Sequence, residues 1–477
     1  MTVSHRPSTA RLPVPRGNGA PVDPSREKPW DLLLLCAAGL ILVAVARVHS
    51  FFPVLDTIRP ALLLTLLGTC ALVLRHRGAR SIKHLKSPIG YLIAFIFLWA
   101  LLGVPFAIYQ GNSARFLANS FLRTGVVVLL IAASVRNVPD LMRLLKVYAL
   151  GAVAFSLLAQ GTGGLRDIGG GGYDPNDSAM FIVSAIPLVI YFLFRAKSIP
   201  GKLLFGFGLL ACGSAVVLTG SRGGFLALIA VLGFSLFFFK GIAPIVRTVA
   251  VAAVAVVVSV SATGEFWERM DTMFDEDDYN RHSVTGRQEI WTRGMGYMVD
   301  NPVLGVGINN FSVAEGRHPE IAAMIQRGRG VRYSAAHSVW VQAGAELGLP
   351  GFIAYLALLG LSIRFLWRLE RQARFRPREP SLEALSEVGR PVIGVLVGLA
   401  VAGTFLSHAY SSLFWVGFAL VLSVTKLSTL AFARITSNSL PQRTLPHAPA
   451  ARPVGSTFSV PAPSRVQKGS VRLPRRG

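Results

Sequence analysis

The chain has 477 residues, of which 52% are hydrophobic and 15% are charged, and its mean hydropathy is +0.52. This composition is too apolar for a soluble globular protein, and the apolar residues form runs of roughly 20, the length that crosses a bilayer. The net charge of +24 does not indicate a nucleic-acid-binding protein, because Lys and Arg fall in particular connections between apolar runs and not on one module. The composition predicts an all-α, polytopic membrane protein.

Both ends of the chain are polar and basic. Residues 1–29 contain several prolines and no apolar core, so they predict a disordered cytoplasmic tail and not a cleavable signal peptide. Residues 433–477 are rich in Pro, Ser and basic residues and contain no Asp or Glu. They predict a second disordered cytoplasmic tail, near anionic lipid.

Twelve apolar runs predict about twelve transmembrane helices. They span about 30–48, 57–74, 88–109, 116–134, 141–160, 177–194, 203–219, 222–239, 243–262, 349–368, 391–409 and 411–432. Lys and Arg concentrate in the even-numbered connections, so the positive-inside rule places those connections and both termini in the cytoplasm. The predicted organisation is nine helices in 30–262, one large extracytoplasmic loop at 263–348, and three helices in 349–432.

The outward-facing connections contain the unusual polar stretches. These are the glycine-rich segment 169–177, the tight turn 220–224 and the loop 263–348, in which acidic residues outnumber arginines and Lys is absent. Apolar and small residues recur in that loop at helical spacing: Ile290, Trp291, Gly294, Met295 and Met298. They predict an amphipathic helix that lies on the bundle or at the membrane interface and ends at Asn301-Pro302.

Two arginines stand at the outer side of the predicted bundle. Arg222 begins the eighth run, where it is either an arginine that snorkels to the interface or a clamp for an anion. One guanidinium can bind two phosphate oxygens at once, and the neighbouring glycines would let backbone N–H groups approach the anion closely. Arg287 opens the amphipathic helix and is either a solvated or Glu-paired arginine or a second cation for the same anion.

His337 leads into the tenth run. At helical spacing its face would include Trp340, Val341 and Gly344, an apolar and small-residue wall on which a histidine is usually structural. Histidine also titrates near neutrality, which suits a general base or a group that orients a hydroxyl. Glu346 would point to the opposite side of a continuous helix, so the two are not expected to pair.

The segment Asp174-Pro175-Asn176-Asp177 follows four glycines. It is suited to a turn and to the N-cap of the sixth predicted helix, and the glycines would also let the loop move over a substrate. The acidic run at 275–278 lacks the spacing of a calcium loop, and the three cysteines lie inside apolar runs without metal spacing. No metal and no cofactor are predicted.

Taken in order, these motifs resemble those of the O-antigen ligase and O-antigen polymerase superfamily, which are bacterial inner-membrane glycosyltransferases. The resemblance covers roughly residues 90–425 and departs from the family pattern at Ser338, where Asn is usual after the histidine. It rests on Asp174-Pro175-Asn176, Ser221-Arg222-Gly223, Gly286-Arg287 with Trp291, Asn301-Pro302 with Gly305 and Gly307, Ala336-His337-Ser338, and Glu346-Leu347-Gly348 with Gly351.

The resemblance implies a metal-independent, GT-C-like transferase of lipopolysaccharide or exopolysaccharide biosynthesis. Its donor would be a glycan linked to polyprenyl diphosphate, and its acceptor a hydroxyl of lipid A-core or of a growing polysaccharide. Arg222 and Arg287 would bind the donor diphosphate, and His337 would orient or deprotonate the acceptor. The supporting residues would be Asp174, Asn176, Ser221, Trp291 and Glu346.

Two other classes of protein compete with this prediction. A transporter or flippase of lipid-linked saccharide should carry several ionisable residues near the middle of its spans, or paired interrupted helices; Arg123 is the ionisable residue noted inside a run. A membrane scaffold would leave the clustered Arg and His residues unexplained. The motifs do not separate a ligase from a polymerase, and they leave the sugar, the linkage and the oligomeric state open.

Overall fold

The computed structural model describes most of the chain between residues 28 and 439. The described residues are 28–47, 51–74, 78–161, 175–240, 243–271, 284, 286–327, 334–375 and 379–439. Their regular structure is helical and contains no strand, which confirms the predicted all-α class. The chain divides into the compact units Met1–Ile435 and Thr436–Gly477, and the architecture below is that of the first. Most of both predicted tails lies outside the described residues.

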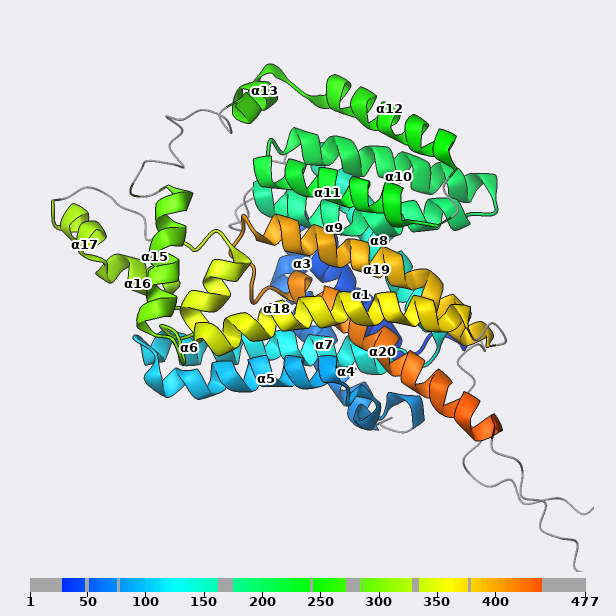
Figure 1. Ribbon diagram of the computed structural model, residues 1–477, viewed down its shortest axis with the longest axis horizontal. Helices are drawn as coiled ribbons and strands as arrows, with labels where there is room; N and C mark the ends of the chain where they lie inside the picture. Colours follow the sequence, from blue (N-terminus) through cyan, green and yellow to red (C-terminus); the bar gives the residue numbers. More distant parts are fainter. Residues whose placement is uncertain are drawn as a thin grey trace, which may run out of the picture. The chain divides into compact units, whose positions relative to one another are not determined.

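Each of the twelve predicted runs overlaps a helix (Figure 1), although α19 begins and ends earlier than the predicted run 391–409. These helices are α1 Leu32–Val45, α4 Pro60–Leu74, α5 Pro88–Gly103, α7 Leu122–Ser134, α8 Val138–Gly161, α9 Pro175–Arg195, α10 Ile199–Leu218, α11 Arg222–Phe238, α12 Pro244–Ser261, α18 Val339–Arg374, α19 Pro380–Gly403 and α20 Ser412–Ser439. Helix α6 (Gln110–Phe116) and the π-helix η4 (Leu117–Phe121) lead into α7. Eight helices of the described part are long and apolar enough to cross a membrane. A multi-pass membrane protein follows, while the count of twelve crossings stays a prediction.

Helix α9 lies at the centre of the bundle. Of the eight long apolar helices it is the most buried, with 83% of its apolar window inside the molecule. It packs against α8, α10, α11 and α19, while α18 packs against α19 and α5. A helix that is apolar on every side is stable when it is surrounded in this way. Because α9 begins at Pro175, its first residues, Asn176 and Asp177, are held at one end of this core.

Helix α18 contains a sharp break at Gly348. This residue has φ 68° and ψ −172°, so a short helix that begins at Val339 is separated from the long one that follows. A Cβ atom at position 348 would lie 2.5 Å from the Val303 carbonyl oxygen. Positive φ and close backbone approach both require glycine here. The predicted start of the tenth apolar run, at 349, coincides with this break.

Replacing Gly348 by alanine is expected to destabilise the protein markedly. The forced positive φ alone costs about 1–3 kcal/mol, and the collision with Val303 adds to it. Thermal unfolding of the purified protein in detergent measures the effect. Gly360→Ala is the matched control, because a Cβ atom there meets nothing within 4 Å. Equal unfolding temperatures for the two variants would contradict the assigned role of Gly348.

The predicted extracytoplasmic loop is built largely from helices. They are α13 Gly264–Asp271, α15 Arg287–Asp300, α16 Phe311–Arg317 and α17 Pro319–Gln326. Helix α15 is the predicted amphipathic helix, and its C-cap is Asn301, as the Asn-Pro pair predicted. Of the residues predicted on its apolar face, Ile290 and Gly294 are buried, whereas Met295 is 51% exposed.

The buried face of α15 turns toward Arg293 because this residue has a partner. Its guanidinium binds both carboxylate oxygens of Glu315 on α16, at 3.0 and 2.6 Å, and the Tyr297 hydroxyl donates to Glu315 at 2.8 Å. The hydrogen bonds to Glu315 raise the pKa of Arg293, and burial raises the pKa of Tyr297. The ion pair therefore fixes α16 on α15 and leaves Met295 on the outer side.

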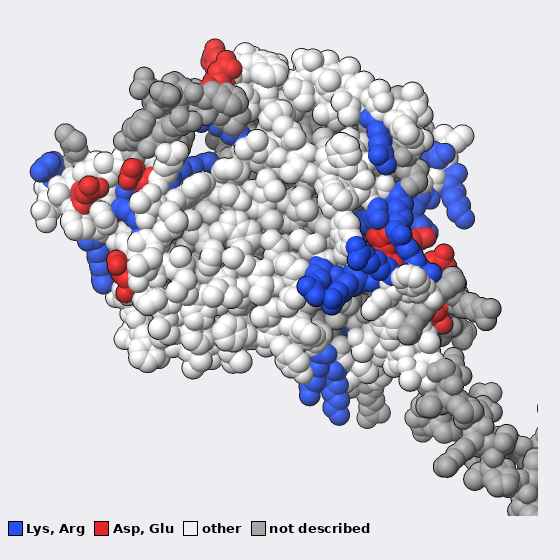
Figure 2. Space-filling model, in the orientation of Figure 1, with Lys and Arg blue, Asp and Glu red and all other residues white. Residues whose placement is uncertain are grey.

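Lys and Arg gather at the end of the bundle that lies away from α15, α16 and α17 (Figure 2). This end contains the connections that follow α9, α11 and α18. The arrangement agrees with the charge pattern from which the topology was predicted. The orientation itself, with residues 263–348 outside and both termini in the cytoplasm, stays a prediction.

Cysteine labelling tests this orientation. In a Cys70→Ser background, which removes the exposed native thiol, Glu320→Cys on α17 is expected to react in intact cells with a reagent that does not cross the inner membrane. Arg371→Cys at the basic end of α18 should react only after the membrane is permeabilised. The opposite pattern would place the site described below on the wrong side of the membrane.

Candidate active site

The turn between α19 and α20, residues 404–411, is the point on which the predicted motifs converge. Helix α19 ends at Gly403 and α20 begins at Ser412. The sequence predicted residues 404–409 as the end of the eleventh apolar run, 391–409, but α19 ends earlier and these residues form the turn. In the structure, side chains of this α19–α20 turn contact three of the predicted motifs.

The first of these motifs is Ser221-Arg222-Gly223. The Ser221 hydroxyl caps α11 by accepting from the Gly224 N–H at 3.0 Å, and it donates to Asn176 Oδ1 at 2.6 Å. Two predicted supporting residues are thereby joined. A Cβ atom at Gly223 would lie 2.7 Å from the ring of Phe405, so α11 begins directly against the α19–α20 turn. Arg222, the first residue of α11, is half-buried at this junction.

The second motif is Arg287 with Trp291 on α15. The Trp291 indole N–H donates to the Ala336 carbonyl at 3.0 Å, and its ring centroid lies 6.3 Å from that of Phe405. Arg287 is half-buried and stands one helical turn before Trp291, so both lie on the same face of α15. Phe405 is therefore the common contact of the segments that carry the two arginines.

The third motif contains His337. Its backbone N–H donates to the Ser407 hydroxyl at 2.7 Å, and its φ is 46°. The side chain is half-buried. His337 precedes the N-cap of α18, Ser338, so the helical face predicted for it with Trp340 does not apply. Trp340 instead donates its indole N–H to Thr404 Oγ1 at 3.1 Å.

The α19–α20 turn also contains a histidine that the sequence analysis missed. His408 Nε2 lies 2.6 Å from Asp177 Oδ1, and each side chain is 12% exposed. Asp177 was considered only as part of the N-terminal turn of α9. The available signal was the polar pair Ser407-His408 near the end of the eleventh apolar run, on the side where the other motifs were predicted.

Glu346 lies beside the α19–α20 turn, where it interacts with Tyr410, but it also binds another segment. Its buried carboxylate accepts from the backbone N–H groups of Asn309 and Phe311, both at 2.9 Å. The Leu349 N–H donates to the Pro302 carbonyl at 2.8 Å. Glu346 therefore holds the Asn-Pro loop, residues 301–310, against α18 and supports the fold of this end.

Two other predictions concern Asp174 and metal ions. Asp174 lies outside the described residues. Within the described part of the chain, no group of three or more His, Cys, Asp or Glu side chains is arranged to hold a metal ion.

The arrangement suits an anion at one end of the bundle. Arg222 and Arg287 are the first residues of α11 and α15, and both helices begin near Phe405. The N-terminus of a helix carries partial positive charge and free N–H groups, which attract anions such as phosphates. The segment of His337 meets the same turn at Ser407, two residues beyond Phe405.

These features define a helical membrane protein with a polar, cation-bearing site at one end of its bundle. Residues 207–356 match the family model described as O-antigen ligase. The predicted resemblance to the O-antigen ligase and polymerase superfamily is confirmed over these residues. The match contains Arg222, Arg287 and His337, whereas Asn176 and the α19–α20 turn lie outside it. No curated protein matches the chain significantly.

Proposed function

We propose that the protein transfers a glycan from a polyprenyl-diphosphate donor to an acceptor hydroxyl at the outer face of the inner membrane. The observation that carries the proposal is the convergence of the segments of Arg222, Arg287 and His337 on the α19–α20 turn. In this proposal, two arginines at helix N-termini bind the diphosphate, and a nearby histidine binds the acceptor hydroxyl. The family match supports the same chemistry.

The proposed reaction is a displacement at the anomeric carbon of the donor glycan. The acceptor oxygen attacks this carbon while His337 takes up the hydroxyl proton, and the bond from the anomeric carbon to the diphosphate oxygen breaks. The electron pair of that bond leaves with polyprenyl diphosphate. Arg222 and Arg287, together with the N-termini of α11 and α15, stabilise the negative charge that develops on the diphosphate. The proton from His337 returns to solvent after transfer.

We assign Asp177 and His408 a positioning role in this reaction. The Asp177 carboxylate holds the His408 ring, and the neighbouring Ser407 holds the backbone of His337. The pair would thus fix the α19–α20 turn, against which the acceptor-binding side of the site is built. A shift of about 1 Å in such a support is enough to cost on the order of 10²-fold in rate.

Substitutions of this pair test the positioning role. His408→Ala is expected to lower kcat for glycan transfer by on the order of 10²-fold, with a much smaller change in KM for the donor. Asp177→Asn should retain most activity, because its amide oxygen still accepts from the His408 ring N–H. Asp177→Ala should behave like His408→Ala. Wild-type kcat in both alanine variants would remove the pair from the mechanism.

A transporter of lipid-linked saccharide is the alternative. Arg123 in α7 is one ionisable residue inside a predicted run. A second, not noted from the sequence, is the buried Lys426 in the described part of α20. Its ammonium donates to the carbonyls of Ala132, Ala133 and Val135 at the end of α7. Lysine is suited to satisfying the last carbonyls of a helix, so Lys426 has a structural role and does not favour a transport path.

A transfer assay in detergent separates the two functions, because solubilised protein has no compartments to transport between. Purified protein is incubated with a polyprenyl-diphosphate oligosaccharide, with lipid A-core as acceptor or with the donor alone. Product linked to lipid A-core indicates a ligase, and lengthened donor glycan indicates a polymerase. Release of one polyprenyl diphosphate per new glycosidic bond is expected. Failure to form product in either reaction would contradict the proposed function.

A further inference from the structure

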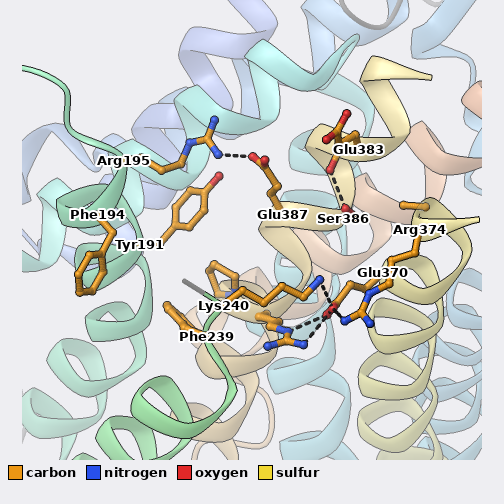
Figure 3. Close-up of a pocket in the computed structure, with 13 residues that line it drawn as sticks. Tyr191, Phe194, Arg195, Phe239, Lys240, Glu370, Arg374, Glu383, Ser386 and Glu387 are labelled. Carbon is orange, nitrogen blue, oxygen red and sulfur yellow. Dashed lines mark hydrogen bonds and ion pairs between the residues drawn. The ribbon is translucent and has the colours of Figure 1, made fainter. Parts of the chain in front are cut away.

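A cavity of about 590 Å³ opens at the basic end of the bundle, away from the candidate active site. It lies among the ends of α9, α18 and α19 and the residues that follow α11 (Figure 3). Its walls combine charged groups with the apolar side chains of Phe194, Phe239 and Pro391. Neither the family resemblance nor the proposed glycan transfer assigns this cavity a function.

Positive charge is in excess on one wall of the cavity. The Glu370 carboxylate accepts from Arg390 at 2.7 and 2.9 Å and from Arg374 at 2.9 Å, and it also pairs with Lys240. With Arg195, Glu383 and Glu387 included, the cavity is lined by four cations and three carboxylates, and this excess of positive charge favours an additional anion. On the opposite wall, Arg195 pairs with Glu387 (Figure 3).

The three cations on Glu370 differ in how firmly they are held. Arg390 binds both carboxylate oxygens and also the Phe238 carbonyl at the end of α11, and its side chain is 18% exposed. The side chains of Lys240 and Arg374 are 51% and 61% exposed. Exposed ion pairs contribute little stability. The charged groups of Lys240 and Arg374 can therefore turn toward a ligand while Arg390 keeps Glu370 neutralised.

The apolar residues indicate what kind of molecule carries the anion. Phe194 is 51% exposed at the end of α9, next to Arg195, and the cavity opens among helices whose composition is that of membrane spans. A phosphate group attached to acyl chains matches this pairing of cations with exposed aromatic surface. Basic pockets between membrane helices bind lipid head groups in the same way.

We propose that the cavity binds an anionic phospholipid, with its phosphate between Lys240 and Arg374 and its acyl chains along the exposed ring of Phe194. The lipid would come from the leaflet at the basic end of the bundle, which is the leaflet opposite the candidate active site. This site would anchor the connection that follows α11 to α18 and α19. It is independent of the proposed glycan transfer.

Lipid binding by the full-length protein tests the proposal. Protein in detergent is titrated with phosphatidylglycerol or phosphatidylcholine, and the bound lipid is counted by native mass spectrometry. The test variant is the double substitution Lys240→Gln with Arg374→Gln, which leaves Arg390 on Glu370 and so preserves the buried ion pair. The matched control is Lys202→Gln with Arg371→Gln. It removes two exposed cations from the same end that do not line the cavity.

Wild type and control are expected to retain one phosphatidylglycerol tightly, in preference to phosphatidylcholine. The Lys240/Arg374 variant should bind it at least about tenfold more weakly, since each cation near a lipid surface contributes to affinity. Equal binding by the test and control variants would overturn the site. Displacement of the lipid by millimolar inorganic phosphate would overturn the assignment to a lipid, because a free phosphate would then satisfy the cations alone.

Discussion

Replacing His337 by alanine is expected to lower glycan transfer by about 10²–10⁴-fold, the range over which general acid–base help contributes to enzymatic rates. Donor binding should change little, because the diphosphate is assigned to Arg222 and Arg287. The backbone N–H of residue 337 still donates to Ser407 in the variant, so the α19–α20 turn should keep its place. The measurement is the initial rate of product formation at saturating donor.

His337→Gln separates two roles of the histidine. An amide holds a hydroxyl but does not accept its proton at neutral pH, so substantial activity in this variant would leave orientation as the role and exclude a general base. His318→Ala is the control, since His318 is a half-buried histidine of the same insert, between α16 and α17. Full activity in His337→Ala would return this residue to a structural role.

Substitution of the two arginines should weaken both binding and transfer. Arg222→Lys keeps the charge but loses the paired geometry of the guanidinium toward phosphate oxygens. Hydrogen bonds to charged groups contribute about 1.5–3 kcal/mol, which corresponds to a loss of roughly 10–100-fold in donor affinity for Arg287→Ala. If both residues hold one diphosphate, the double variant should lose less than the sum of the single losses.

Arg327→Ala is the matched control for these variants, because Arg327 is an exposed arginine that follows α17. It should bind and transfer as the wild type does. Fully additive losses in the double variant would indicate that Arg222 and Arg287 act on different groups. Unchanged transfer in both single variants would indicate that Arg222 and Arg287 are interface arginines. It would contradict the proposal that they bind the donor diphosphate.

Local patterns predicted much of the fold because helix formation and membrane insertion depend on neighbouring residues. The apolar runs located the helices, and Asn301-Pro302 located the end of α15. The buried face of α15 has a long-range cause, because it follows the ion pair between Arg293 and Glu315, which lie on different helices. Periodicity within one helix does not contain that information.

The candidate site was predictable in part for the same reason. The distribution of Lys and Arg predicted that its segments lie on one side of the membrane. It did not predict the contacts that join them. The hydrogen bond of Asp177 with His408 and that of His337 with Ser407 link distant parts of the chain. Glu346 likewise joins distant segments, since its carboxylate binds the backbone of the 301–310 loop and interacts with Tyr410 of the α19–α20 turn. Only packing reveals the α19–α20 turn as their common contact.

Binding of the leaving group across the variants tests the proposed mechanism most directly. The affinity of purified wild type for polyprenyl diphosphate is compared with that of His337→Ala and of the Arg222→Lys, Arg287→Ala double variant. The mechanism predicts wild-type affinity in His337→Ala together with lost transfer, and at least roughly tenfold weaker binding in the double variant. Unchanged binding in the double variant, or lost binding in His337→Ala, would contradict a site in which the arginines hold the diphosphate and the histidine serves the acceptor.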